Sequence, residues 1–265
     1  MSLKRTKSLQ ILCLCLTVGV VLAQQWWEKK PYSEWSAKQV QRMLDRSPWS
    51  TVHTVAVLNP GYYQSSRSTG IPPFADDSDY NPRMLGMGVQ ERLNHFHLRF
   101  LTAKPIRLAL ARDMTLRAQQ EPEPAAIERF VQYTDDRFMV LLMTLSSEPP
   151  GADSINQYMS TLLTLTTPDL TADTSLATRT GKRVYLARYE PPGPDGLGAK
   201  FYFPRKLPDG SPFVVPGDKE VRFETQIQLF DIIPQQSWTP PQSRTDKVYG
   251  RFKLQKMIFE GKLEI

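Results

Sequence analysis

The clearest regularity along the chain is an alternation of apolar and polar positions over residues 220–229. One side of this segment would carry Val221, Phe223, Thr225, Ile227 and Leu229, and the polar residues between them would face the other way. Side chains of a β-strand point alternately to the two faces of a sheet, so this period predicts a strand with one buried face.

A second alternating segment covers residues 89–101. Its apolar side contains Phe96, Leu98 and Phe100, which we expect to be buried. The opposite side presents His95, His97 and Arg99 in a row. We therefore predict a strand whose second face is polar.

The most completely specified helix begins after Ser36. Gln39 follows three residues later and completes a capping box, while Trp35 before the cap can pack against Val40. Apolar residues at helical spacing supply one buried stripe, and Pro48 prevents continuation of the helix.

The remaining patterns are shorter. Helices are predicted over residues 102–118, 124–132 and 154–163, the first of which also has some strand-like alternation. Strands are predicted over residues 51–58, 138–145, 176–179, 183–189, 200–203 and 248–259, with Thr180-Gly181 as a hairpin turn and a closing hairpin over 260–265. Residues 59–82 contain much Gly, Ser, Pro and Asp and predict a long loop.

These elements predict one α+β domain with a mostly antiparallel sheet of about seven or eight strands and about three or four packing helices. We divide the chain into a leader (residues 1–23), an N-terminal aromatic arm with its capped helix (24–50), and an α+β domain continuous with that arm (51–265).

The first 23 residues have the composition of a secretory signal peptide. Lys4, Arg5 and Lys7 precede an apolar run from Leu9 to Leu22, and Val21-Leu22-Ala23 provides a cleavage pattern before Gln24. The apolar run has about 14 residues, fewer than the roughly 20 that a membrane-spanning helix needs. We expect cleavage after Ala23, export to the periplasm or the medium, and no membrane span in the mature chain.

Composition then limits the chemistry of the mature chain. The two cysteines, Cys13 and Cys15, both lie in the leader, so disulfides and thiol chemistry are excluded once it is removed. The leader also holds three of the 33 basic residues and no acidic ones, which leaves 30 minus 27, or a net charge of +3. No block of Lys and Arg remains, and we predict no nucleic-acid partner.

His53, His95 and His97 are the three histidines of the chain. Imidazoles two positions apart on one strand face can share a divalent metal, and His53 could join them if its strand pairs alongside. Arg99 on the same face argues against a cation. No cofactor is predicted beyond this weak metal site.

Other catalytic patterns are absent from the sequence. Asp77-x-Asp79-x-Asn81 resembles the opening of a calcium loop, but Pro82 stands where an EF-hand needs glycine, so we interpret the segment as a solvated acidic loop. The chain contains no nucleophile elbow, zinc-protease motif or phosphate-binding glycine loop, and we assign no catalytic residue.

Trp26, Trp27, Trp35 and Trp49 account for four of the five tryptophans. Exposed indoles can bind sugar rings or a protein groove, whereas buried ones anchor a segment to the core. We expect Trp35 and Trp49 to be anchors, and we mark Trp26 and Trp27 as candidate binding residues.

Several short segments resemble those of a group of uncharacterised exported bacterial proteins of the acidobacterial type. The similar segments are Trp35-Ser36 with Val40, Met43, Leu44 and Ser47-Pro48-Trp49; residues 102–107 with Ala109 and Arg112; Phe201-Tyr202-Phe203-Pro204-Arg205; and Phe252-Lys253-Leu254 with Met257 and residues 261–264. The resemblance implies a single exported unit and brings no activity or site residue.

The sequence therefore favours an exported, non-enzymatic binding protein of the cell envelope that contacts a protein or an extracellular polymer. Two alternatives stay open: a metal-assisted hydrolase that uses His53, His95 and His97, and a small-ligand carrier with a pocket between sheet and helices.

Overall fold

The computed structural model describes residues 26–57, 92–118, 122–148, 150, 153–215, 217–230 and 243–265. The leader, the predicted loop at 59–82 and its acidic Asp77 motif lie outside these residues. The described part is α+β with antiparallel sheets, as the sequence predicts.

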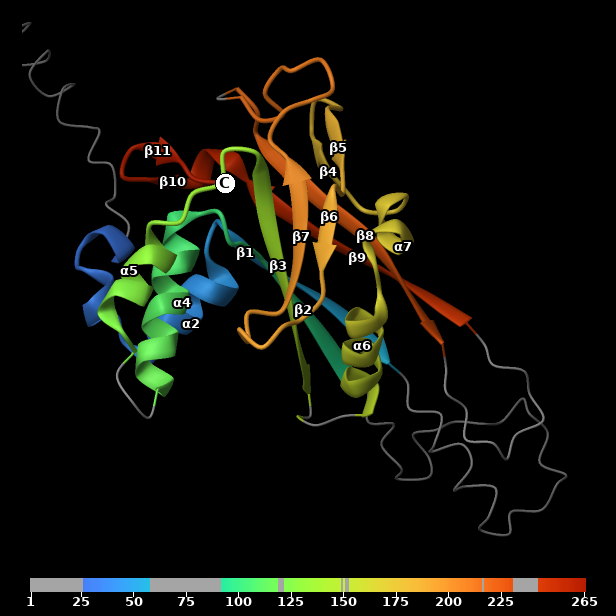
Figure 1. Ribbon diagram of the computed structural model, residues 1–265, viewed down its shortest axis with the longest axis horizontal. Helices are drawn as coiled ribbons and strands as arrows, with labels where there is room; N and C mark the ends of the chain where they lie inside the picture. The colour runs from blue at the N-terminus through green and yellow to red at the C-terminus, as the bar shows by residue number, and fades with distance from the viewer. Residues whose placement is uncertain are drawn as a thin grey trace, which may run out of the picture.

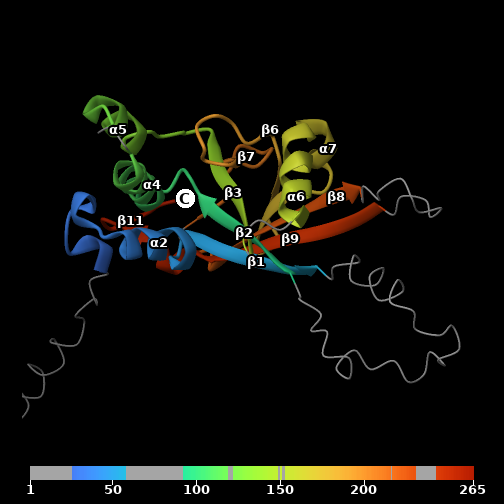
Figure 2. The same ribbon diagram turned by 90° about the horizontal axis from the view of Figure 1, so that it is seen from below.

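The helices gather at two places (Figure 1). The α-helices are α2 (Ala37–Arg46), α4 (Lys104–Arg117), α5 (Pro124–Val131), α6 (Asp153–Thr164) and α7 (Thr167–Thr171). Short 3-10 turns are η1 (Trp26–Glu28), η2 (Tyr32–Glu34) and η4 (Leu254–Lys256). In both views α2, α4 and α5 lie together at one end of the molecule, and α6 and α7 lie beside β8 (Figures 1 and 2).

The strands form two main sheets. One has the order β1-β2-β3-β7-β6, made from β1 (Ser50–Val57), β2 (Arg92–Phe100), β3 (Phe138–Glu148), β7 (Ala199–Pro204) and β6 (Arg188–Glu190). The other has the order β5-β4-β8-β9, made from β5 (Arg183–Tyr185), β4 (Ser175–Thr178), β8 (Glu220–Phe230) and β9 (Ser243–Lys253). A small hairpin pairs β10 (Ile258–Phe259) with β11 (Lys262–Leu263).

The single sheet of seven or eight strands is therefore corrected to two sheets of five and four strands plus a hairpin. Part of the difference arises at residues 183–189, which the sequence predicts as one strand. After β5 the chain changes sheet: Leu186 N donates to Thr174 O, and Ala187 N donates to Tyr202 O on β7. Strands β5 and β6 therefore belong to different sheets, because each finds a different partner.

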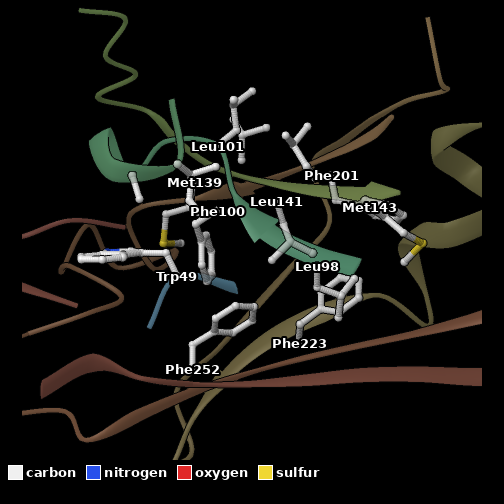
Figure 3. Packing of buried hydrophobic residues seen from close by; sticks show 14 of the residues in the cluster. Trp49, Leu98, Phe100, Leu101, Met139, Leu141, Met143, Phe201, Phe223 and Phe252 are labelled. Atoms are coloured by element: carbon white, nitrogen blue, oxygen red, sulfur yellow. The ribbon is translucent and has the colours of Figure 1, made fainter. Parts of the chain in front are cut away.

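The core lies where the two sheets pack face to face (Figure 3). Phe100 of β2 meets Phe252 of β9 with 4.6 Å between ring centroids, and Phe201 of β7 meets Phe223 of β8 at 5.6 Å. The predicted inner positions of β8 at 221, 223, 225 and 227 are buried. Aromatic packing of this kind combines a large buried area with edge-to-face contacts, which stabilises the pair of sheets.

The local predictions for α2 are confirmed in detail. Gln39 N donates to Ser36 Oγ, and Ser36 N donates to Gln39 Oε1 at 3.0 Å, which forms the capping box. Trp35 and Val40 are both buried. The helix is thereby fixed at its start and packed along one side against the rest of the core.

Helix α7 is absent from the sequence prediction. Its signal is a second capping box, in which Thr166 Oγ1 donates to Asp169 Oδ2 at 2.6 Å and Thr166 N donates to the same oxygen at 2.8 Å. The helix is only five residues long, so it contains too few positions to show a period.

Candidate functional site

The three histidines do not share a face. His95 and His97 lie on the polar side of β2, and their ring centroids are 6.4 Å apart. His53 on β1 is paired across the ladder with Phe96, so it points toward the buried side of the sheet. Directly opposed residues of neighbouring strands share a side of the sheet. The register therefore separates His53 from the other two imidazoles.

His53 lies at the seam between β1 and β9. Its ring centroid is 4.3 Å from that of Tyr249 and 6.3 Å from that of Phe96. Burial lowers the pKa of His53 below its ordinary value and outweighs the opposing effects of the Lys247 backbone and of Asp246. His53 is therefore uncharged at neutral pH and packs against the ring of Tyr249.

Within the described residues, no group of three or more His, Cys, Asp or Glu side chains is arranged to hold a metal ion. The three-histidine site of the hydrolase hypothesis is not assembled by this fold, because the period of β1 and its register with β2 direct His53 to the opposite side.

His97 instead joins Asp45 and Ser146. Asp45 Oδ1 is 3.1 Å from His97 Nδ1, and His97 Nε2 is 2.8 Å from Ser146 Oγ. Burial alone would raise the pKa of Asp45, but hydrogen bonds from His97, Gln41 and Arg99 hold that pKa well below its usual value. The carboxylate is therefore ionised at neutral pH.

The connectivity of Asp45, His97 and Ser146 is that of a nucleophilic triad, which the sequence does not reveal because the three residues lie far apart in the chain. Such a triad also needs donors aimed at a developing oxyanion. Strand backbone N–H groups lie in the plane of the sheet, whereas the Ser146 side chain projects from it. Among the described residues, the strand around Ser146 therefore supplies the hydrogen-bonded chain from Asp45 through His97 to Ser146, while its own backbone N–H groups are not directed at the hydroxyl.

Arg99 shows the structural role of this cluster. Its guanidinium donates to Leu44 O at 2.6 Å, to Thr144 Oγ1 at 2.9 Å and to Asp45 Oδ1 at 3.0 Å. Arg99 is 7% exposed. The cluster ties the end of α2 to β2 and β3, and buried charges need partners of this kind.

The candidate binding residues Trp26 and Trp27 belong to an aromatic cluster. Trp26 lies 5.4 Å from Trp35 and 5.5 Å from Trp27, and Trp27 lies 5.6 Å from Trp49, all between ring centroids. Trp27 is 7% exposed and Trp26 is partly buried. In this arrangement the buried Trp27 packs as an anchor of the arm, and a binding role for Trp26 and Trp27 stays a prediction.

The outer side of the sheet β5-β4-β8-β9 carries exposed aromatic and charged side chains. Antiparallel register places Tyr185, Ser175, Glu224 and Tyr249 in one row across the four strands. The adjacent row contains Arg183, Ala177, Arg222 and Arg251. We call these two rows, together with Gln226, Lys247 and Lys253, the Tyr–Arg face.

The aromatic members of this face are accessible. Tyr185 is 54% exposed and Tyr249 is 55% exposed, so each ring offers one side to solvent. Three inter-strand steps of about 4.8 Å place their backbones about 14 Å apart. The two tyrosines are thus carried by the edge strands of a sheet that packs on the core.

A polar hollow of about 220 Å³ opens beside Tyr249. Its walls include Asp173, Glu224, Gln226 and Lys247. Gln226 Nε2 donates to Asp173 Oδ1 at 3.3 Å, which orients the amide. Carboxylate, amide and ammonium groups around one depression can bind a ligand rich in hydroxyl or charged groups.

A second, apolar groove of about 580 Å³ lies between α4, α5 and the loop that follows β6. Ion pairs flank it: Arg117 Nε is 2.9 Å from Asp113 Oδ1, and Lys200 Nζ is 2.6 Å from Asp195 Oδ2. Its apolar walls are Leu110, Met114, Ala118, Pro122, Ala126, Ile127, Phe130 and Leu197.

The sequence predicts β4 and β8 of the Tyr–Arg face and assigns Arg222, Glu224 and Gln226 outward. Its predicted strand over residues 248–259 is corrected to β9 (Ser243–Lys253), followed by η4 and β10. The sequence does not identify Tyr185 and Tyr249 as neighbours, because only the register of four strands brings them into one row.

Comparisons with protein-family models, with curated proteins and with solved structures found no match to this chain. Among the described helices, none has both the length and the apolar composition that crossing a membrane requires.

Proposed function

We propose that the protein is an exported binding protein of the cell envelope and that it contacts a protein or an extracellular polymer through the Tyr–Arg face. The observation that carries the proposal is the row with Tyr185 and Tyr249, two tyrosines that are each more than half exposed on one rigid sheet. Tyrosine supplies a large contact area at low entropic cost, since it has few rotatable bonds.

The buried residues on the inner side of this sheet favour binding without a large conformational change. Beneath the exposed side chains, Phe223 and Phe252 are almost fully buried. His53 packs against Tyr249 from the neighbouring sheet and restricts its ring. A preorganised surface loses little conformational entropy on binding.

The N-terminal sequence supports the extracellular setting. Its basic start, short apolar run and Ala23 cleavage pattern are those of an export signal. Export also gives access to polymers and proteins of the envelope, which are the partner classes that this surface fits.

The test is a pair of substitutions on the face, Tyr185→Ala with Tyr249→Ala, in the mature chain. We expect binding to immobilised cell-envelope polymers and to a glycan array to weaken about tenfold, because two aromatic contacts of about 0.5–1.5 kcal/mol each are removed. Tyr133→Ala is the matched control, since Tyr133 is 41% exposed outside the face. Equal binding by the wild type and the double variant would contradict the proposal.

A small-ligand carrier is the second candidate function, and the apolar groove between α4 and α5 favours it. A groove of about 580 Å³ is large enough for a small apolar molecule. The measurement is native mass spectrometry of the purified protein, with the fluorescent dye anilinonaphthalene sulfonate as a probe.

Ala126→Trp would fill that groove with an indole. Ala37→Trp, in contrast, places the same side chain at an exposed position at the start of α2. We expect only Ala126→Trp to abolish dye binding and remove any co-purified ligand. Unchanged dye binding by Ala126→Trp would exclude the groove as the carrier site.

A further inference from the structure

We infer that the partner of the Tyr–Arg face is an acidic polysaccharide, a chain of sugar rings that carry carboxylate or sulfate groups. This inference rests on the proposed function and narrows it to one class of ligand. Three features of the face support it: unpaired basic side chains, two accessible aromatic rings, and the polar hollow between strands.

The first feature is an excess of positive charge that the protein does not neutralise. Glu220 pairs with Arg222 at 2.6 Å, and Glu224 pairs with Arg183 at 3.6 Å. None of the ion pairs found in the described part of the chain involves the exposed residues of β9, which are Lys247, Arg251 and Lys253. Three cationic groups thus lie on one side of β9, with Tyr249 between Lys247 and Arg251 on the same side.

The register makes this charge more costly for the free protein. Arg222 on β8 lies directly opposite Arg251 on β9. Like charges in directly opposed positions of a sheet repel and destabilise the pair. Glu220 offsets part of this repulsion through Arg222, and an anionic group bound beside Arg251 would offset the rest.

The second feature distinguishes a polysaccharide from other polyanions. Tyr185 and Tyr249 end the row beside the arginines, with the small Ser175 between them. Sugar rings pack their apolar C–H faces on aromatic rings, and two such side chains on strands whose backbones are about 14 Å apart fit a chain of repeating rings. The row of tyrosines and the row of arginines would then contact the two sides of one extended chain.

The third feature provides polar partners for sugar hydroxyls. Asp173 and Glu224 line the hollow beside Tyr249. These carboxylates accept hydrogen bonds from hydroxyl groups, but they would repel an anionic group of any kind. The hollow therefore suits the hydroxyl groups of the ligand, and the acidic groups of the ligand would lie at the cationic side chains of β9.

The experiment measures binding of the mature protein to polygalacturonate, a carboxylated polysaccharide, and to chondroitin sulfate, a sulfated one. Neutral dextran, poly-glutamate and single-stranded DNA are the comparison ligands. We expect binding to at least one acidic polysaccharide, no binding to dextran, and a loss of affinity of about tenfold or more between 0.05 M and 0.5 M NaCl because salt screens exposed charges.

The decisive variant is the triple charge reversal Lys247→Glu, Arg251→Glu and Lys253→Glu. Its matched control is Lys29→Glu, Lys38→Glu and Arg129→Glu, which changes the net charge equally at exposed residues outside the face. We expect the β9 reversal to weaken polysaccharide binding about tenfold or more, and the control about twofold or less. Circular dichroism checks that both variants retain the wild-type fold.

The outcomes separate this inference from the proposed function. Tyrosine-dependent binding of a neutral glycan or a protein, without the β9 charges, would overturn the inference and leave the proposed function standing. Equal affinity for poly-glutamate or DNA, or equal losses in the two triple variants, would also overturn it by revealing general attraction between charges.

Discussion

At the scale of single residues, the buried Arg99 connects a helix to a strand through three hydrogen bonds. Its guanidinium contacts α2 through Leu44 and Asp45 and contacts β3 through Thr144. Asp45 is its one carboxylate partner among the described ion pairs. A nearly buried cation with a single anionic partner depends strongly on that partner, because the charge has little access to water.

We therefore expect Asp45→Asn to lower the free energy of unfolding by about 3 kcal/mol, since it removes the carboxylate that forms the ion pair with Arg99. Glu224→Gln is the control: the side chains of Glu224 and its partner Arg183 are 54% and 42% exposed, and the loss there should be about 0.5 kcal/mol or less. Urea denaturation of both variants measures the difference. Similar losses at the two sites would show that burial of Arg99 has no energetic effect.

His53 gives a pH dependence of known sign. Its pKa is lowered by burial in the folded protein, so the unfolded chain takes up a proton first as the pH falls below about 6.5. The stability contributed by neutral His53 is thus present above that pH and is lost as the solution becomes more acidic. Protonation favours the unfolded state in this window.

The measurement is the free energy of unfolding of the wild type and of His53→Phe at pH 7.5 and pH 5.5. We expect a smaller decrease in the variant, which retains a ring against Tyr249 but cannot be protonated. His95 and His97 are present in both proteins, so the difference reports on His53. A decrease of the same size in both would disprove this assignment.

At the scale of elements, the seam between β1 and β9 decides how closely the two sheets approach. The two strands lie side by side in both views (Figures 1 and 2). A Cβ atom at Gly250 of β9 would lie 2.7 Å from Thr51 Cγ2 and 2.8 Å from Leu98 Cδ1. Both distances are shorter than ordinary van der Waals contact, so glycine permits the approach.

We expect Gly250→Ala to destabilise the protein by about 1–3 kcal/mol, because the added methyl group overpacks a core that already contains fully buried Leu98. Gly217→Ala is the matched control, as nothing lies within 4 Å of its added Cβ and its φ is not positive. Thermal unfolding compares the two. An unaffected melting temperature for Gly250→Ala would mean that the seam can open at no cost.

At the scale of the whole molecule, packing and hydrogen bonds connect the elements. We expect the mature chain to contain no cysteine, so that disulfides would not contribute. Segments far apart in sequence are tied together: Trp49 Nε1 donates to Glu264 O at 2.9 Å, and Arg205 Nη2 donates to Ile265 O at 2.7 Å. The aromatic arm joins the same hydrophobic cluster as both sheets.

We expect the protein exported by a bacterial host to begin at Gln24, with a mass reduced by residues 1–23. Its melting temperature should not change with a reducing agent, since Cys13 and Cys15 leave with the signal. Intact-mass spectrometry of the exported fraction and thermal scans with and without dithiothreitol make the test. Full-length protein confined to the cytoplasm would contradict the proposed export.

The sequence by itself determined the elements whose signals are local. Helix α2 follows from Ser36 and Gln39, and β8 follows from its alternation, because capping bonds and side-chain period depend only on residues close in the chain. The α+β class follows from the same patterns.

The tertiary structure alone decided which strands pair and in what register. It placed β5 and β6 in different sheets, turned His53 away from His95, brought Asp45 and Ser146 to His97, and set Tyr185 in line with Tyr249. The reason is physical: the partners of a strand are selected by the packing of distant aromatic residues such as Phe201 and Phe223, which no local pattern encodes.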